Sequence, residues 1–193
     1  MLRCVSFLLL LGFAASAESL AAPYSLCFLG NGPRAGSFDK PTAAALQEKH
    51  MAHIQRMWEA GVLESAGPVG DLPGVRAIFV FSVPLAEAQR WTNQDPKLQA
   101  GDLSVSCYLW NAPAAVGQDY RARYGKPGFQ EKMLSLRAVF SQNPLPASLV
   151  SGALDHPEWK HFQVLPENSP TPTTGKTFRW FHDPQVWPSR SSE

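Results

Sequence analysis

The chain carries little excess charge and few special motifs. Its 193 residues contain 17 Lys and Arg against 16 Asp and Glu, which gives a formal net charge of +1, and the basic residues form no run. Nucleic-acid-binding surfaces are usually strongly basic, so we expect no nucleic-acid partner. The sequence has no glycine-rich phosphate loop, no G-x-S-x-G motif and no C-x-x-C pair. These absences argue against the common nucleotide-binding, serine-hydrolase and thiol-redox classes.

Long apolar runs are also missing, except at the N-terminus. There, Arg3 precedes an apolar run from Val5 to Ala15, and the small-residue sequence that follows offers cleavage after Ala17 or Ala22. This order is typical of a secretory signal peptide. The run is shorter than the ~20 residues that a helix needs to cross a bilayer. We therefore predict a signal peptide over residues 1–22 and a secreted or periplasmic protein that has no membrane contact after cleavage.

Proline divides the rest of the chain into two regions. Seven of the 17 prolines precede Asn111 and ten follow it. We predict a compact domain over residues 23–112 and a proline-rich C-terminal extension, residues 113–193, that is partly ordered against it. Within the extension, Phe129, Met133, Leu136 and Phe140 have helical spacing and predict a helix over 129–140.

Hydrophobic periodicity predicts six elements in the compact domain. They are strand 24–29, helix 41–60, strand 62–66, strand 76–83, helix 84–93 and strand 103–110. Pro41 suits the first helical turn and Gly61 suits the position after a helix ends. This order predicts a ferredoxin-like α+β sandwich, in which two helices cover one face of a four-stranded antiparallel sheet. The first and fourth strands should then be neighbours.

His50 is the polar exception in the apolar stripe of the helix predicted over 41–60. A buried polar group without a hydrogen-bond partner costs ~1–3 kcal/mol, so the imidazole needs a partner. Asp95 ends the second predicted helix, which should pack beside the first on the same face of the sheet. A carboxylate there would orient the imidazole for general acid–base chemistry. The alternative is a structural core histidine bonded to the backbone.

Residues 50–68, HMAHIQRMWEAGVLESAGP, resemble the signature of YCII-related proteins. That signature is a histidine on an amphipathic helix, a short strand and then Ala-Gly-Pro. The resemblance continues through the turn at Gly74, the Asp95-Pro96 step and Ala100-Gly101, and it covers roughly residues 23–112.

The resemblance implies a ferredoxin-like fold of the dimeric α/β-barrel type, with a homodimer formed through the sheets. It also implies an active site built on His50 and Asp95, and a pocket shaped by Gly67 and Pro68. His53, one turn from His50, is an addition to the family pattern and is expected either at the rim of this pocket or on the surface. Family members have been linked to lyase-type or dehydrochlorinase-like chemistry on small aromatic compounds.

This chain departs from the family in two respects. YCII-related proteins are usually cytoplasmic and end close to the fourth strand, whereas this chain carries an export signal and residues 113–193. The extension has three candidate roles: it covers the pocket, blocks the dimer face or supplies ligands of its own. The inherited oligomeric state is therefore open.

Two cysteines, Cys27 and Cys107, remain after signal cleavage. They lie near the middles of two strands that should be neighbours, in a compartment that permits disulfides. The alternatives are a cross-strand disulfide and two buried thiols. His156, His161 and His182 match no spacing of a known metal site, so we predict no metal.

Two hypotheses on function follow from these residues. In the first, His50 and Asp95 form the acid–base pair of a small-molecule lyase or isomerase, working without a cofactor. In the second, the same pocket belongs to a non-catalytic module that binds a small organic ligand or dimerises.

Overall fold

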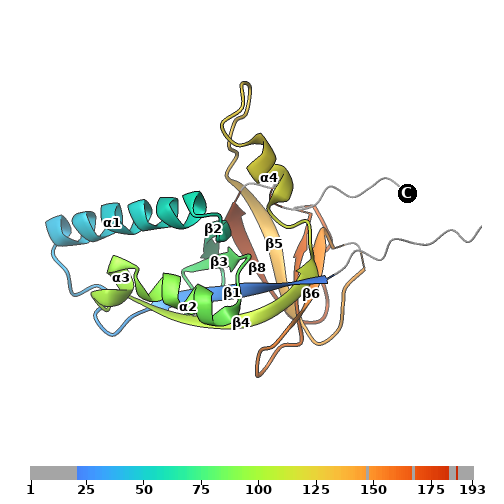
Figure 1. Ribbon diagram of the computed structural model, residues 1–193. Coiled ribbons are helices and arrows are strands. Elements are labelled where there is room, and N and C mark those ends of the chain that lie inside the picture. The colour runs from blue at the N-terminus through green and yellow to red at the C-terminus, as the bar shows by residue number, and fades with distance from the viewer. Residues whose placement is uncertain (1–20, 147, 167, 183–185, 187–193) are drawn as a thin grey trace, which may run out of the picture.

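The computed structural model describes residues 21–146, 148–166, 168–182 and 186, so most of the predicted signal peptide lies outside the described residues (Figure 1). Eight antiparallel strands form a closed barrel in the order β1-β3-β2-β8-β5-β7-β6-β4. The strands are β1 Ala21–Asn31, β2 Leu63–Gly70, β3 Ala77–Phe81, β4 Leu103–Pro113, β5 Leu134–Ser141, β6 Val150–Leu154, β7 His161–Leu165 and β8 Lys176–His182. The helices are α1 Lys40–Glu59, α2 Leu85–Asn93, α3 Pro96–Gln99 and α4 Gln118–Arg123.

The predicted ferredoxin-like sandwich was wrong as a fold class. The six predicted elements are present, and β1 and β4 are paired neighbours as expected. However, β5 to β8 come from the predicted extension and close the sheet into a barrel. The physical reason is that the second face of β1–β4 is also apolar. Phe28, Val80 and Trp110 point into the barrel and are covered there by the chain's own C-terminal strands.

The barrel lumen is filled with side chains and forms the larger core. Its buried members are apolar residues of seven strands and of the segments that flank them, and the partly buried Val69 of β2 packs against them. The largest of those that are fully buried are Trp110, Trp180, Phe162 and Phe178. The sheet face on which the resemblance placed a second copy therefore faces this packed lumen.

A second core lies between the outer face of β1–β4 and the helices (Figure 1). Met57 of α1 and Ala88 of α2 pack there against Leu29, Phe79 and Phe81 of the sheet. Helix α1 begins after Asp39, whose carboxylate accepts a hydrogen bond from Thr42 N (2.9 Å), and it ends before Gly61, which adopts φ 75°. Its first turns are exposed, and His50 lies where the helix reaches the sheet. None of the described helices is long and apolar enough to cross a membrane.

The helix predicted over 129–140 was also wrong. Residues 134–141 form β5, in which Leu136, Ala138 and Phe140 alternate into the lumen. The barrel seam between β2 and β8 is short, with only Val69 and Gly70 of β2 paired to β8.

Candidate functional site

A cleft of about 520 Å³ opens beside α1. Its walls are α1, strand β2 and the connection from β4 to β5 that contains α4. The lining is mostly apolar and aromatic, with Trp58, Phe79 and Tyr120 among its larger side chains. A concave and largely apolar cleft with a few polar groups is typical of a small-molecule site.

His50 and Asp95 meet at this cleft. Nδ1 of His50 lies 2.6 Å from Oδ2 of Asp95, across 45 residues of sequence. His50 lines the cleft and is 8% exposed, while Asp95 is 1% exposed. Because an ionised carboxylate can only accept hydrogen bonds, Nδ1 of His50 is the donor, and Nε2 is left as the atom available for chemistry.

Asp95 is held in place by its position before a helix. It is the N-cap of α3, and its second oxygen, Oδ1, accepts a hydrogen bond from Lys97 N at 2.8 Å. Pro96 occupies the first helical position, where a missing N–H costs nothing. The Asp-Pro step therefore fixes the carboxylate that orients His50. On its other side, the ring of His50 is stacked near Phe79, with the ring centroids 6.3 Å apart.

Lys97 is a further member of this network that the sequence did not indicate. It is buried, and its Nζ donates to Gln47 Oε1 of α1 (2.8 Å) and lies 3.2 Å from Asp102 Oδ2. Lys97 thus ties α3, and with it Asp95, to α1 and to the start of β4. The only signal in the sequence was a lysine two residues after Asp95, which local periodicity does not separate from a surface lysine.

Glu64 and Arg121 anchor α4 over the cleft. Arg121 donates to the main-chain oxygens of Trp58 (3.0 Å) and Leu63 (2.7 Å), and it lies 3.4 Å from Glu64 Oε2. Ser82 donates to the other oxygen of Glu64 at 2.7 Å. The guanidinium also sits 3.8 Å from the centre of the Trp58 ring.

Close approach at the start of α4 requires glycine. A Cβ at Gly117 would lie 2.2 Å from Glu64 Oε2, and the residue adopts φ 82°.

Burial and the charge of nearby Glu64 together raise the pKa of the Tyr24 phenol. The charge of Glu64 therefore acts on Tyr24 as well as on its direct partners Arg121 and Ser82.

Ser65 brings an unpaired polar atom to the cleft. It lines the cavity and is 6% exposed, and its buried hydroxyl has no hydrogen-bond partner among the described residues. Such a group costs ~1–3 kcal/mol relative to a paired one. It is one of two buried unpaired side-chain atoms found in the described part of the chain.

Of the other predicted site residues, Gly67 and Pro68 line the cleft and His53 does not. Gly67 and Pro68 line the cleft, and a Cβ at Gly67 would lie 2.1 Å from Phe181 O, so a larger residue would push β2 away from β8. His53 is neither on the surface nor in the cleft lining. It is 1% exposed, and its Nε2 lies 2.9 Å from Trp91 O of α2, so it joins the two helices.

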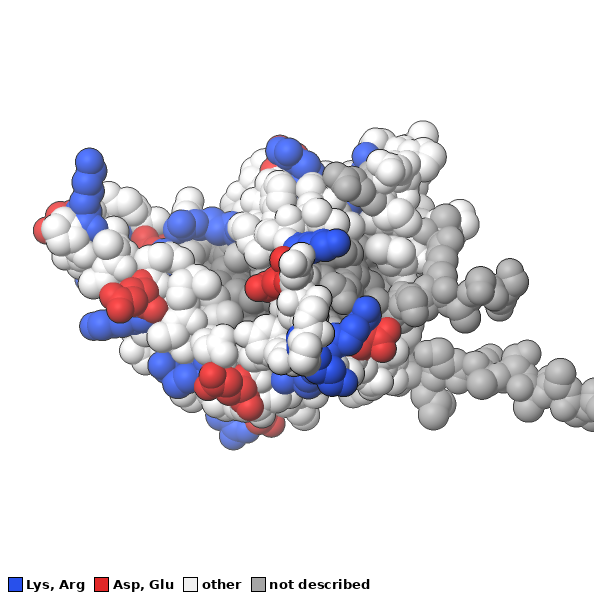
Figure 2. Space-filling view, turned by 90° about the horizontal axis from the view of Figure 1, so that it is seen from above, with Lys and Arg blue, Asp and Glu red and all other residues white. Residues whose placement is uncertain are grey.

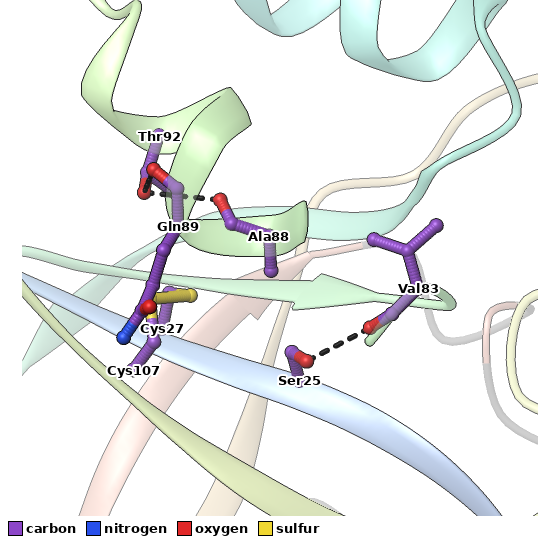
Figure 3. Close-up of a disulfide and its surroundings, with 7 residues drawn as sticks. All are labelled: Ser25, Cys27, Val83, Ala88, Gln89, Thr92 and Cys107. Atoms are coloured by element: carbon purple, nitrogen blue, oxygen red, sulfur yellow. Dashed lines mark hydrogen bonds between the residues drawn. A yellow bond between two sulfur atoms is a disulfide. The ribbon is translucent and has the colours of Figure 1, made fainter. Parts of the chain in front are cut away.

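Cys27 and Cys107 form a disulfide beneath α2 (Figure 3). They are opposite each other in the register of β1 and β4, on the helix-covered side of the sheet. The bond is remote from the cleft lining, which contains neither residue. It links two strands of the scaffold that carries the site.

No group of three or more His, Cys, Asp or Glu that could hold a metal ion occurs among the described residues.

No model of a known protein family matches the chain, and a search of curated proteins finds no significant match.

Proposed function

We propose that the cleft binds a small organic molecule and that His50 moves a proton on it. The observation that carries this proposal is the 2.6 Å contact between His50 Nδ1 and Asp95 Oδ2 at the wall of an open cleft. No hydrogen bond engages Nε2 of His50 within the described chain. The resemblance to YCII-related proteins favours the same pair.

The proposed reaction begins with Nε2 of His50 as the proton acceptor. A C–H bond acidified by a neighbouring carbonyl gives its proton to Nε2, and the bonding electrons move into the carbonyl as an enolate. Asp95 stabilises the imidazolium that forms, because it accepts the hydrogen bond from Nδ1. Return of the proton to another carbon completes an isomerisation, and loss of a leaving group from the enolate completes an elimination.

A non-catalytic ligand carrier is the second candidate. Met51, Tyr124 and Met133 line the cleft and remain 52%, 45% and 57% exposed, so the rim presents apolar surface to solvent. Such a rim favours binding of an apolar molecule whether or not it reacts. In this case His50 and Asp95 serve only to hold α3 against α1.

The Cys27–Cys107 disulfide supports a location outside the cytoplasm, as does the apolar N-terminus. We therefore place the activity in the periplasm or outside the cell. His50 is oriented by Asp95 and, through α3, by Lys97, and neither of these two residues lines the cleft.

Hydrogen exchange tests the enzymatic proposal without knowledge of the natural substrate. A panel of small aryl and alkyl ketones is incubated with the protein in D₂O, and deuterium incorporation is followed by mass spectrometry. We expect exchange on a subset of ketones, reduced at least ~100-fold in His50→Asn, since general-base catalysis contributes ~10²–10⁴-fold. Asp95→Asn should lower it by a comparable factor.

Asp155→Asn is the matched control for Asp95→Asn, because Asp155 is exposed and does not line the cleft. Its substitution should leave the exchange intact. If His50→Asn exchanges every ketone as fast as the unmodified chain while remaining folded, the general-base role is wrong and the carrier remains.

A further inference from the structure

The charged side chains that line the cleft have one sign. Two carboxylates, Glu64 and Glu131, line it, and no Lys or Arg of the described chain does. Surface charges elsewhere are interspersed, with no large area of one sign on the face seen in Figure 2. Sites that bind carboxylates or phosphates generally present Arg or Lys to them. The lining residues that the structure describes include no such partner, and the nearby Arg121 is already engaged by Glu64 and Trp58.

The two carboxylates differ in what they can offer a ligand. Glu64 is compensated by Arg121 and Ser82 and is buried. Glu131 is exposed and accepts a hydrogen bond from the Tyr120 hydroxyl at 2.9 Å, but it forms no ion pair within the described residues. Glu131 therefore leaves a net negative charge at the cleft wall.

An aromatic cluster adjoins this charge. Trp58, Tyr120 and Tyr124 have ring centroids 5.3 to 5.8 Å apart, and all three line the cleft. The cluster already holds one cation, the guanidinium of Arg121 over Trp58. Aromatic faces attract cations, and the attraction grows when the cation is partly desolvated. The aromatic cluster and the Glu131 carboxylate therefore both favour a positively charged ligand.

The buried hydroxyl of Ser65 adds a polar requirement. It is more than nine-tenths buried, lines the cleft and lacks a partner in the described chain. A ligand with a hydrogen-bonding group at that position removes the cost of the unpaired hydroxyl.

We propose that the cleft selects an amine-bearing aromatic molecule and rejects carboxylates and phosphates. The protonated amine lies beside Glu131 and the aromatic cluster, and the apolar body fills the cleft toward His50. A second polar group on the natural ligand pairs with Ser65. This proposal rests on the proposed function only in taking the cleft as the ligand site, and it holds for an enzyme or a carrier alike.

Three phenyl probes of similar size test the selection by titration calorimetry on the full chain. They are 2-phenylethylamine, 2-phenylethanol and 3-phenylpropionate, which are cationic, neutral and anionic at pH 7. We expect the amine to bind about tenfold more tightly than the alcohol, and the carboxylate to bind more weakly than both. Equal or tighter binding of 3-phenylpropionate would overturn the proposal, and so would no detectable binding of the amine at millimolar concentration.

Glu131→Gln separates charge from shape, because the amide oxygen still accepts from Tyr120. It should remove most of the amine's advantage over the alcohol and leave the alcohol's affinity within about twofold. Glu48→Gln, an exposed substitution on α1 outside the cleft lining, is the matched control and should change neither. If Glu131→Gln leaves the amine's advantage intact, the electrostatic assignment is wrong.

The proposed function fails on different measurements. Loss of ketone exchange in His50→Asn with unchanged amine preference supports both proposals. Unchanged exchange in His50→Asn removes the general-base role but leaves the ligand selection standing, because that selection is measured by binding alone.

Discussion

The barrel lumen and the cleft beside α1 differ in whether their buried polar atoms have hydrogen-bond partners. In the lumen, Nε1 of Trp110 donates to Phe162 O and Nε1 of Trp180 donates to Gly67 O, each at 3.2 Å. In the cleft, Ser65 keeps an unpaired buried hydroxyl and His50 keeps Nε2 open. The two regions share the strands of one sheet. The lumen therefore stabilises the fold, whereas the cleft retains polar groups whose partner must come from outside the described chain.

The largest expected effect belongs to the lumen. Phe162 is fully buried, and its ring lies 5.4 Å from that of Trp110 and 5.5 Å from that of Phe140. Phe162→Ala should lower the free energy of unfolding by about 3–5 kcal/mol, because it leaves a large cavity in a packed core. Urea unfolding followed by circular dichroism measures it.

Phe38→Ala is the matched control for this substitution. Phe38 lies in the loop before α1 under the guanidinium of Arg34, and we expect a loss below about 1 kcal/mol. A loss that small for Phe162→Ala would break the distinction between a lumen that stabilises and a cleft that binds.

The second largest effect is expected at the disulfide on the helix-covered face. Cys27 and Cys107 are 80 positions apart in the sequence, so removing the bond frees a long loop in the unfolded chain. The double variant Cys27→Ser, Cys107→Ser should lose about 2–4 kcal/mol of stability. Its affinity for 2-phenylethylamine should be unchanged below its melting temperature, since neither residue lines the cleft. Free thiols at both positions in the denatured, unreduced chain would contradict the bond.

The N-terminal half of the fold was accessible from sequence because its signals are local. The helix predicted over 41–60 matches α1, Lys40–Glu59, since Pro41 and Gly61 mark its ends within a few residues of chain. The strand at 76–83 contains β3, Ala77–Phe81, because its apolar run is bounded by turns. Such elements are specified by residues that are neighbours in sequence.

The C-terminal half was not accessible for the opposite reason. In β5, Leu136 and Phe140 are four residues apart, a spacing that fits both a helix face and every second position of a strand. What decides for the strand is its pairing with β8 and β7, and these contacts are 20 or more residues away. The prolines of the predicted extension gave no sign of these strands, because Pro144, Pro157 and Pro166 stand in the connections that flank them.

Some residues of the candidate site could be predicted from the sequence, and others could not. The contact of His50 with Asp95 followed from the expectation that two helices share one face of a sheet, and that arrangement holds although the predicted fold class was wrong. Ser65 and the Glu64–Arg121 pair could not be predicted. Their environment depends on α4 and on the closure of the barrel, which connect positions 50 or more residues apart.

The next effect has the opposite sign and lies in the cleft. Ser65→Ala removes a buried hydroxyl that has no partner, so we expect the free energy of unfolding to rise by up to about 1 kcal/mol. Ser25→Ala is the control, since Ser25 is fully buried but donates to Val83 O at 2.8 Å (Figure 3). That variant should be destabilised by about 1 kcal/mol. If both serines respond with the same sign, the cleft is not distinguished by its unpaired polar atom.

The smallest effect is an acid sensitivity at the mouth of the barrel, near neither His50 nor Asp95. Nδ1 of His156 accepts hydrogen bonds from the backbone N–H groups of Glu158 (3.0 Å) and Trp159 (3.2 Å), which requires a neutral ring. Burial is the main cause that lowers the pKa of His156 below its ordinary value. The unfolded chain therefore binds a proton more readily at this position than the folded chain does.

The contribution of His156 to stability is therefore fully present above the unfolded pKa of ~6.5 and declines as the pH falls below it. His156→Asn places an amide oxygen where Nδ1 accepts, without a titrating ring. The difference in unfolding free energy between the unmodified chain and this variant, measured by urea melts from pH 8 to pH 5, should shift in favour of the variant on acidification. A difference that stays constant over this range would contradict the contribution of His156 to acid sensitivity.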